Sequence, residues 1–175
     1  MRNAAIAATA GGIDMYQKIV LAFDGSHEAR SALREGALLA LRCEARVWLL
    51  CVLGDNAAIA MAEGVQPGAA EQIAAASQQL VDEGVGKLRS IGLTATGHIV
   101  RGDPSTAISN FVREVGADLV VLGHRRRSFL ERWWSGKSGG YIVDNVDCSL
   151  LVAQQPVSDE EFAAEMALHA VHAPG

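Results

Sequence analysis

The chain has 175 residues, of which 50% are apolar and 20% are charged, and its mean hydropathy is +0.17. This balance excludes an intrinsically disordered chain and fits one domain of about 150 residues with short extensions. The net charge of −5 gives no overall attraction to nucleic acid or to an anionic membrane surface. No apolar run approaches the roughly 20 residues of a membrane-spanning helix. We therefore expect neither a nucleic-acid nor a membrane partner.

The cysteines and the N-terminus both favour a protein of a reducing compartment. Cys43, Cys51 and Cys148 form no close pair and have no metal-ligand spacing. Free thiols are the simplest interpretation, so we expect a cytoplasmic protein without a bound metal. The apolar stretch near the N-terminus is too short for a secretory signal, which needs about 7–15 apolar residues. Residues 1–15 are expected to be a flexible extension.

In chain order, short apolar runs that predict strands alternate with segments of helical periodicity. Near-continuous apolar strands separated by helices are typical of a parallel sheet covered on both faces. The expected elements are a strand over 17–23, a helix capped by Ser26 and running to about 42, a strand over 45–53, a helix over about 69–90, a strand over 94–100, a helix over 104–116, a strand over 117–122, a short helix over about 138–145, a strand over 148–153 and a tail helix over about 158–170.

Glycine, proline and aspartate mark the ends and the weak points of these helices. Asp103 is a suitable N-cap and Pro104 a suitable first residue for one helix, and Gly116 ends its apolar periodicity. Gly84 and Gly86 lie inside another helix, where each is expected to cost about 1 kcal/mol relative to alanine.

Right-handed crossovers arrange such units as an open, doubly wound α/β sandwich. We expect a five-stranded parallel sheet with the strand order 3-2-1-4-5. Ligands of these folds bind outside the carboxyl ends of the strands, where the strand order reverses. The predicted ligand crevice therefore lies between the loop after Phe23 and the loop after Leu122.

Four segments around this crevice carry a resemblance to a known family. They are the strand IVLAFDGS over 19–26, the strand end LLCV over 49–52, the RGDP motif over 101–104 with ADLVVLG over 117–123, and a glycine-bounded loop over 123–136 followed by CSLLV over 148–152. On these segments, residues 16–154 resemble the universal stress protein family. The resemblance implies a Rossmann-like, adenine nucleotide alpha hydrolase-like sandwich. Residues 155–175 then form a C-terminal helical extension that is a candidate for docking on a partner subunit.

The glycine-bounded loop matches the family's nucleotide motif in part. Nucleotide-binding members carry glycine, two residues, a second glycine, nine residues, and then glycine followed by serine or threonine. Gly123 and Gly136 occupy the first and last glycine positions, whereas Arg126 replaces the middle glycine. Lys137 replaces the closing serine or threonine, and Ser138 follows one place later. Glycines let backbone N–H groups approach phosphate oxygens, and a following helix N-terminus favours anions.

Three interpretations of the basic loop are open. Arg125, Arg126 and Lys137 can bind phosphates directly, because arginine makes bidentate contacts with them. Alternatively, the Arg126 side chain fills the phosphate site and blocks it. In the third interpretation, the loop is a solvated surface segment.

The resemblance implies a regulatory, homodimeric protein of the stress response that binds ATP, with or without Mg, and has no fast turnover or catalytic residue. The dimer contact is expected at 148–153. Two other functions are open: a nucleotide-free interaction or signalling module whose Trp133 and Trp134 loop recruits a partner, and an enzyme that activates ATP at the same crevice. The expected nucleotide-binding residues are Ala22, Phe23, Asp24, Val52, Gly102, Gly123, Arg125, Arg126, Gly136, Lys137 and Ser138.

Overall fold

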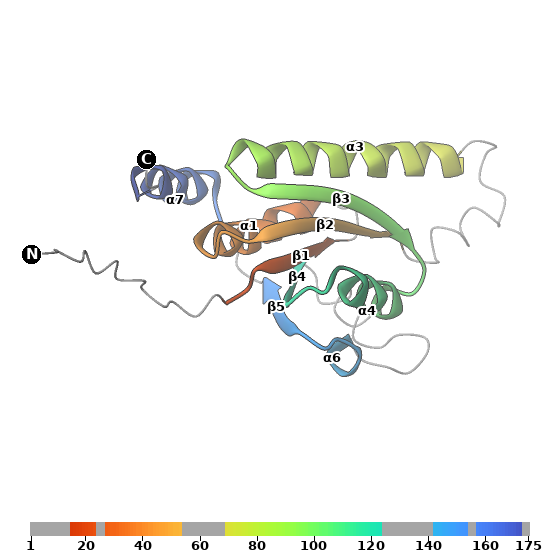
Figure 1. Cartoon of the computed structure of the whole chain (residues 1–175). Helices are drawn as coiled ribbons and strands as arrows, with labels where there is room; N and C mark the ends of the chain where they lie inside the picture. Colours follow the sequence, from red (N-terminus) through yellow and green to blue (C-terminus); the bar gives the residue numbers. More distant parts are fainter. Residues whose placement is uncertain (1–14, 24–26, 54–68, 124–141, 154–156, 173–175) are drawn as a thin grey trace, which may run out of the picture.

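The computed structural model of the chain describes residues 15–23, 27–53, 69–123, 142–153 and 157–172 (Figure 1). Strands and helices alternate along the described chain as the apolar periodicity predicts. The elements are β1 (Lys18–Phe23), α1 (His27–Arg42), β2 (Arg46–Leu53), α3 (Ala69–Ser90), β3 (Thr94–Arg101), α4 (Pro104–Val115), β4 (Leu119–Gly123), α6 (Ile142–Asn145), β5 (Ser149–Ala153) and α7 (Asp159–His172).

The described strands form one parallel sheet in the order β3-β2-β1-β4-β5. The chain builds β2 and β3 on one side of β1 and then crosses to build β4 and β5 on the other. The predicted strand order and fold class are confirmed. The order therefore reverses between β1 and β4.

The side chains of β1 alternate between two buried clusters, one on each face of the sheet. Ile19, Leu21 and Phe23 pack in a cluster with residues of α1 and α3. Val20 and Ala22 pack in the other cluster, with residues of α4 and α6. In Figure 1, α1, α3 and α7 lie on one side of the sheet, and α4 and α6 lie on the other. This alternation is why the strand is apolar at every position.

Both ends of α4 have the caps that the sequence predicts. The Asp103 carboxylate accepts hydrogen bonds from the Thr106 backbone N–H at 3.1 Å and from the Thr106 hydroxyl at 3.0 Å. Pro104 occupies the first helical position, and Gly116 ends the helix in the left-handed conformation, with φ 62°.

Replacing Asp103 with alanine is expected to lower the free energy of unfolding by about 1 kcal/mol, because the N-terminal N–H groups of α4 lose their acceptor. Urea-induced unfolding measures the change. Asp144→Ala, at an exposed position of α6, is the control and should change stability by less than about 0.5 kcal/mol. Equal effects of the two substitutions would contradict the capping role.

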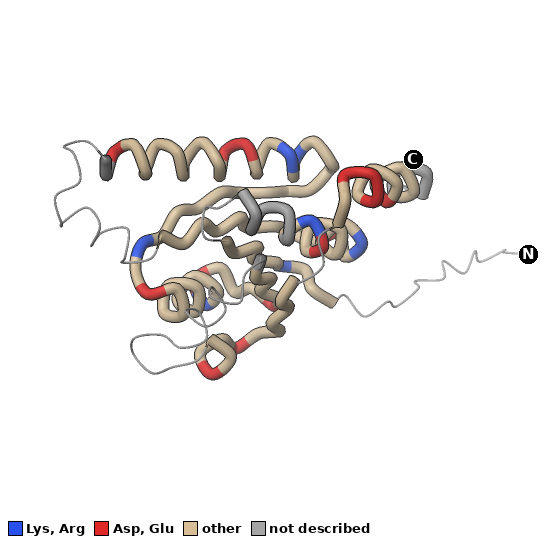
Figure 2. Tube along the Cα trace, turned by 180° about the vertical axis from the view of Figure 1, so that it is seen from behind, with Lys and Arg blue, Asp and Glu red and all other residues tan. Residues whose placement is uncertain are grey.

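The C-terminal helix α7 packs on α1 of the same chain. Phe162 and Met166 contact the cluster beneath α1. Arg42 forms an ion pair with Glu165 at 2.7 Å, and Arg34 forms one with Asp159. Figure 2 shows basic positions of α1 beside acidic positions of α7. Of the apolar tail residues, Phe162 and Met166 are thus half-buried within the chain, whereas Leu168 is 57% exposed.

Candidate functional site

The carboxyl ends of the strands meet at one edge of the sheet, where the ligand crevice is predicted. Ala22 of β1 lies beside Leu50 of β2 on one side and Leu122 of β4 on the other. On the far side of β4, Gly123 pairs with Ala153 of β5. The strand ends are thus in register at the point where the strand order reverses. In open α/β sheets this edge is where ligands bind.

Three predicted nucleotide-binding residues have fully buried side chains at this edge. Ala22 and Phe23 are 0% exposed and Val52 is 2% exposed. Ala22 and Val52 belong to the cluster under α4, and Phe23 belongs to the opposite cluster under α1. Any ligand contact of these residues therefore involves backbone atoms at the strand ends. The Phe23 side chain is a core residue.

Gly102 joins β3 to α4 in a conformation that favours glycine. Its φ is 128°, which residues with a Cβ rarely adopt. Its backbone N–H donates a hydrogen bond to the carbonyl of Leu53 at 3.1 Å. Its two chain neighbours aside, no atom of the described residues lies within 4 Å of a Cβ built on Gly102. Open space therefore lies next to the Gly102 backbone, immediately before the capped N-terminus of α4.

Helix α6, which follows the predicted phosphate loop, is fixed beside α4. The Asn145 side-chain amide donates to the Ser105 hydroxyl at 3.5 Å, and the Ser109 hydroxyl donates to the Ser105 carbonyl at 2.7 Å. Ile142 is fully buried in the cluster under α4. The chain thus leaves the described sheet at Gly123 and returns at Ile142 against α4 (Figure 1).

The charged half of the predicted site lies outside the described residues. The structure brings Ala22, Phe23, Val52, Gly102 and Gly123 to the carboxyl edge, and the first three offer only backbone atoms there. The roles of the remaining residues stay predictions. Those outside the described residues are Asp24, Arg125, Arg126, Gly136, Lys137, Ser138 and the loop residues Trp133 and Trp134.

The Cys43 and Cys148 thiols are poorly suited to nucleophilic chemistry. Burial raises the pKa of the Cys43 thiol, and the Asp118 carboxylate raises it further. Burial also raises the pKa of Cys148, more than a backbone hydrogen bond lowers it. Both thiols are therefore protonated near neutral pH and are weak nucleophiles. Within the described ranges, no group of three His, Cys, Asp or Glu residues is placed to hold a metal ion.

A cavity on the opposite face of the sheet was not predicted from the sequence. It has a volume of about 330 Å³ and lies between α1, α3 and α7, above Leu21 of β1 and Leu49 of β2. Leu33 and Ala37, on the predicted apolar face of α1, line it, but nothing in the periodicity distinguishes a cavity from a filled core. Arg34 and Lys87 also line this cavity.

The described fold is a doubly wound α/β sandwich whose strand order reverses between β1 and β4. The model of the universal stress protein family matches residues 15–154. The chain belongs to the universal stress protein family. No helix among the described residues is long and apolar enough to cross a membrane.

The relatives agree with this assignment in sequence and in fold. Universal stress protein MJ0531 of Methanocaldococcus jannaschii is 25% identical over 83% of this chain and 86% of its own length. The solved structure of the hypothetical protein MJ0577 has a TM-score of 0.64 at 20% identity, covering 82% of this chain and 99% of its own. The solved structure has the adenine nucleotide alpha hydrolase-like fold, and the prediction of that fold is confirmed.

Two similar structures contain an adenine nucleotide. A universal stress protein in complex with cAMP has a TM-score of 0.55 at 20% identity, over 80% of this chain and 98% of its own. The universal stress protein from Archaeoglobus fulgidus in complex with dAMP has a TM-score of 0.56 at 19% identity, over 80% of this chain and 99% of its own. At these identities the likeness to this chain is a likeness of fold.

Proposed function

We propose that this chain binds an adenine nucleotide, ATP with or without Mg, as a regulatory ligand of the stress response. The nucleotide binds at the carboxyl edge of the sheet between β1 and β4. The observation that carries the proposal is the backbone of this edge: the strand ends are in register, and Gly102 has open space at its Cα. Open space at a glycine lets a phosphate or a base edge approach the backbone closely.

The family supports the same ligand class. Related structures hold cAMP and dAMP, two molecules that share an adenine base and a phosphate. The glycines of the family's phosphate motif at Gly123 and Gly136 are retained in this sequence. In the proposed arrangement, Gly123 begins the phosphate loop, and Arg125, Arg126 and Lys137 supply the positive charge that the phosphates need.

The proposed role is regulatory, without fast turnover. The raised pKa values of Cys43 and Cys148 favour unreactive thiols, and no Ser-His-Asp arrangement is evident in the sequence. Release of ADP or AMP from ATP within minutes, at substoichiometric protein concentration, would instead support an enzyme that activates ATP.

A pair of glycine substitutions tests the location of the nucleotide. Gly102 and Gly92 both have positive φ, at 128° and 95°, and at both a Cβ would be free of atoms of the described residues beyond its chain neighbours. Gly102 follows β3 at the carboxyl edge, whereas Gly92 precedes β3 at the amino edge. Alanine at either position is expected to cost about 1–3 kcal/mol through backbone strain. Only the Gly102→Ala methyl group obstructs the proposed ligand.

Thermal unfolding with and without Mg-ATP measures nucleotide binding by the wild-type protein and by the two variants. At a nucleotide concentration 100 times Kd, the wild-type protein gains about 2.7 kcal/mol, a rise in Tm of about 5–10 °C. Gly92→Ala keeps this rise, and Gly102→Ala loses at least half of it. No rise at millimolar ATP, AMP or cAMP in the wild-type protein would overturn the proposal.

Arg126 provides the second arm of the same experiment. If the Arg126 side chain blocks the phosphate site, the wild-type protein shows no nucleotide-dependent rise in Tm and Arg126→Gly gains one. That outcome favours the nucleotide-free interaction module. If Arg126 binds phosphate, Arg126→Gly weakens the rise that the wild-type protein shows.

We further propose a homodimer that forms through β5. Among the described strands, β5 has a neighbour on one side only, and Leu150, Leu151 and Val152 are half-buried there. The Ser149 backbone N–H donates to the carbonyl of Asp118 at 3.1 Å. Because N–H directions alternate along a strand, those of Leu150 and Val152 are directed to the open edge. An open apolar edge favours pairing with a second copy.

Replacing Val152 with proline is expected to convert the dimer to a monomer, because proline removes an N–H from the open edge without removing one from the β4 ladder. Light scattering after size exclusion measures the mass, and circular dichroism checks that the fold is kept. The wild-type chain is expected to run at twice the monomer mass. A wild-type monomer, or a Val152→Pro dimer of unchanged affinity, would contradict the proposed interface.

A further inference from the structure

The cavity between α1, α3 and α7 has the composition of a small-molecule site. Its volume of about 330 Å³ lies within the range of about 300–1,000 Å³ that is usual for ligand pockets. The walls are mostly aliphatic, with Leu33, Leu49, Leu88 and Ile91 among them. Such walls favour an alkyl chain, because each buried methylene contributes about 0.8 kcal/mol.

The charged residues that line the cavity are both basic. Arg34 comes from α1 and Lys87 from the last turn of α3, and the described part of the lining includes no aspartate or glutamate. Arg34 donates to the Val157 carbonyl at 2.8 Å and forms an ion pair with Asp159. A guanidinium has five N–H donors, so these contacts leave donors available. The lysine is exposed, so its ammonium group is accessible to a ligand from solvent.

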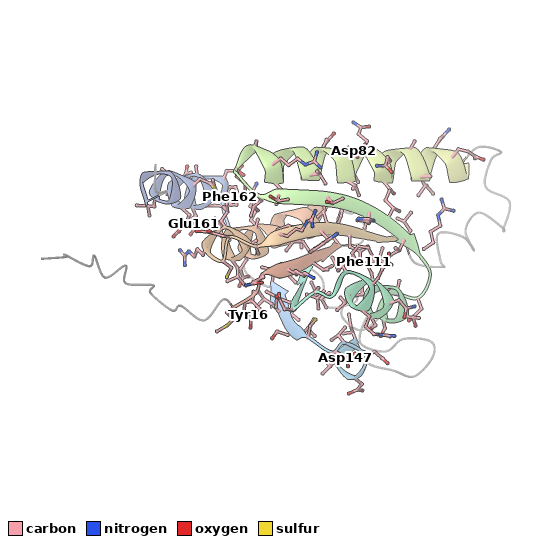
Figure 3. All side chains as sticks on the ribbon, viewed as in Figure 1. Tyr16, Asp82, Phe111, Asp147, Glu161 and Phe162 are labelled. Carbon is pink, nitrogen blue, oxygen red and sulfur yellow. The ribbon has the colours of Figure 1, made fainter. Side chains whose placement is uncertain are left out.

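Helix α7 supplies the aromatic wall of the cavity. Phe162 lines the cavity, and the Arg34 guanidinium lies 5.9 Å from the centre of its ring. In Figure 3, Phe162 lies between α7 and α1. The tail that extends the chain beyond the residues matched by the family model therefore contributes to the cavity.

We propose that this cavity binds an amphipathic carboxylate, a medium-chain fatty acid or a similar molecule. Its alkyl chain lies against the aliphatic walls and Phe162, and its carboxylate pairs with Lys87 and Arg34. The site is separate from the nucleotide crevice. The cavity is over Leu21 and Leu49, in the middle of β1 and β2, on the face covered by α1 and α3. The proposal does not depend on nucleotide binding.

Calorimetric titration of the full chain with decanoate, below its micelle concentration, tests the proposal. Saturable binding of one decanoate per chain is expected, and decyltrimethylammonium, with the same chain length and the opposite charge, is expected to bind much more weakly. Equal binding of the two probes, or no saturable binding of decanoate, would overturn the proposal. ATP at saturation should leave the decanoate affinity unchanged.

Two variants locate the site. Lys87→Gln is expected to weaken decanoate binding about three- to fivefold, as expected for the loss of one exposed ion pair. Gln72→Glu, at an exposed position of the same helix, changes the net charge equally and serves as the control. Ile91→Trp fills the cavity from its half-exposed rim and should abolish binding while the unfolding temperature stays near that of the wild type. Equal decanoate affinities of Lys87→Gln and Gln72→Glu would place the ligand elsewhere, as would unchanged binding by folded Ile91→Trp.

Discussion

Replacing Phe23 with alanine is expected to lower the free energy of unfolding by about 3–5 kcal/mol, the usual cost of removing a buried phenylalanine side chain. Phe23 is 0% exposed and is among the largest fully buried side chains of the described core. It packs in the cluster on the α1 and α3 face of the sheet, beside Leu21 of β1 and Cys51 of β2. Its substitution leaves a cavity in the central strand.

Urea-induced unfolding of Phe23→Ala measures this loss. Val143→Ala is the control, because Val143 is 51% exposed and its truncation should change stability by less than about 0.5 kcal/mol. The resemblance to the family placed Phe23 among the nucleotide contacts, whereas its burial places the side chain in the core. A loss below about 1 kcal/mol for Phe23→Ala, together with lost ATP binding, would favour the side-chain contact instead.

The second large effect is expected at Gly97, in the middle of β3. A Cβ at this position would overlap the Val81 side chain and would lie 3.0 Å from Cγ2 of Val85, both in α3. Both valines are buried, at 1% and 7% exposure, and a β-branched side chain has few alternative rotamers. Gly97→Ala should therefore lower the free energy of unfolding by about 1–3 kcal/mol through overpacking.

Gly86→Ala is the matched control, and it is expected to change the free energy of unfolding in the opposite direction. Gly86 lies in the interior of α3, and a Cβ there would meet no described atom within 4 Å outside the backbone of its own helix. Alanine is the better helix former, so Gly86→Ala should raise the free energy of unfolding by about 0.5–1 kcal/mol. Thermal unfolding of both variants shows whether Gly97→Ala lowers stability and Gly86→Ala raises it. A Gly97→Ala protein as stable as the wild type would show that α3 is not held as closely against β3 as described.

Gly84 shows where sequence reasoning reached its limit. Helix propensity treats Gly84 and Gly86 alike, as two weak points of one helix. In the structure a Cβ at Gly84 would lie 2.5 Å from Cδ2 of Leu49, so the absence of a side chain lets α3 approach β2. Only tertiary packing distinguishes the two glycines, because it depends on a residue 35 positions away in the chain.

The fold was largely predictable because its signals are local. Apolar runs predicted the strands, and the Asp103-Pro104 pair and Gly116 predicted the ends of α4, with the cap contacts as expected. The handedness of the crossovers predicted an open, doubly wound sheet, although it fits more than one strand order. The contacts of α7 did not follow, because its ion pairs join residues more than 120 positions apart, such as Arg42 and Glu165.

Of the candidate site, only the residues at the strand ends, whose backbone lies at the carboxyl edge, can be compared with the sequence prediction. The family resemblance indicated Ala22, Val52, Gly102 and Gly123, and the strand register brings these residues to one edge. It did not indicate that the Phe23 side chain points into the core, because in an all-apolar strand both faces look alike in sequence. The cavity was not foreseen either, because periodicity predicts which residues face inward and not how completely they fill the space.

The most direct test of the central claim is an NMR titration of the isotope-labelled full chain with ATP. We predict saturable shifts of the backbone amide resonances of Phe23, Gly102 and Gly123 at the carboxyl edge. The amide resonances of Gly92, at the opposite edge, and of Lys87, at the cavity between α1, α3 and α7, should not shift. No shift at millimolar ATP, or shifts confined to residues away from the carboxyl edge, would contradict nucleotide binding between β1 and β4.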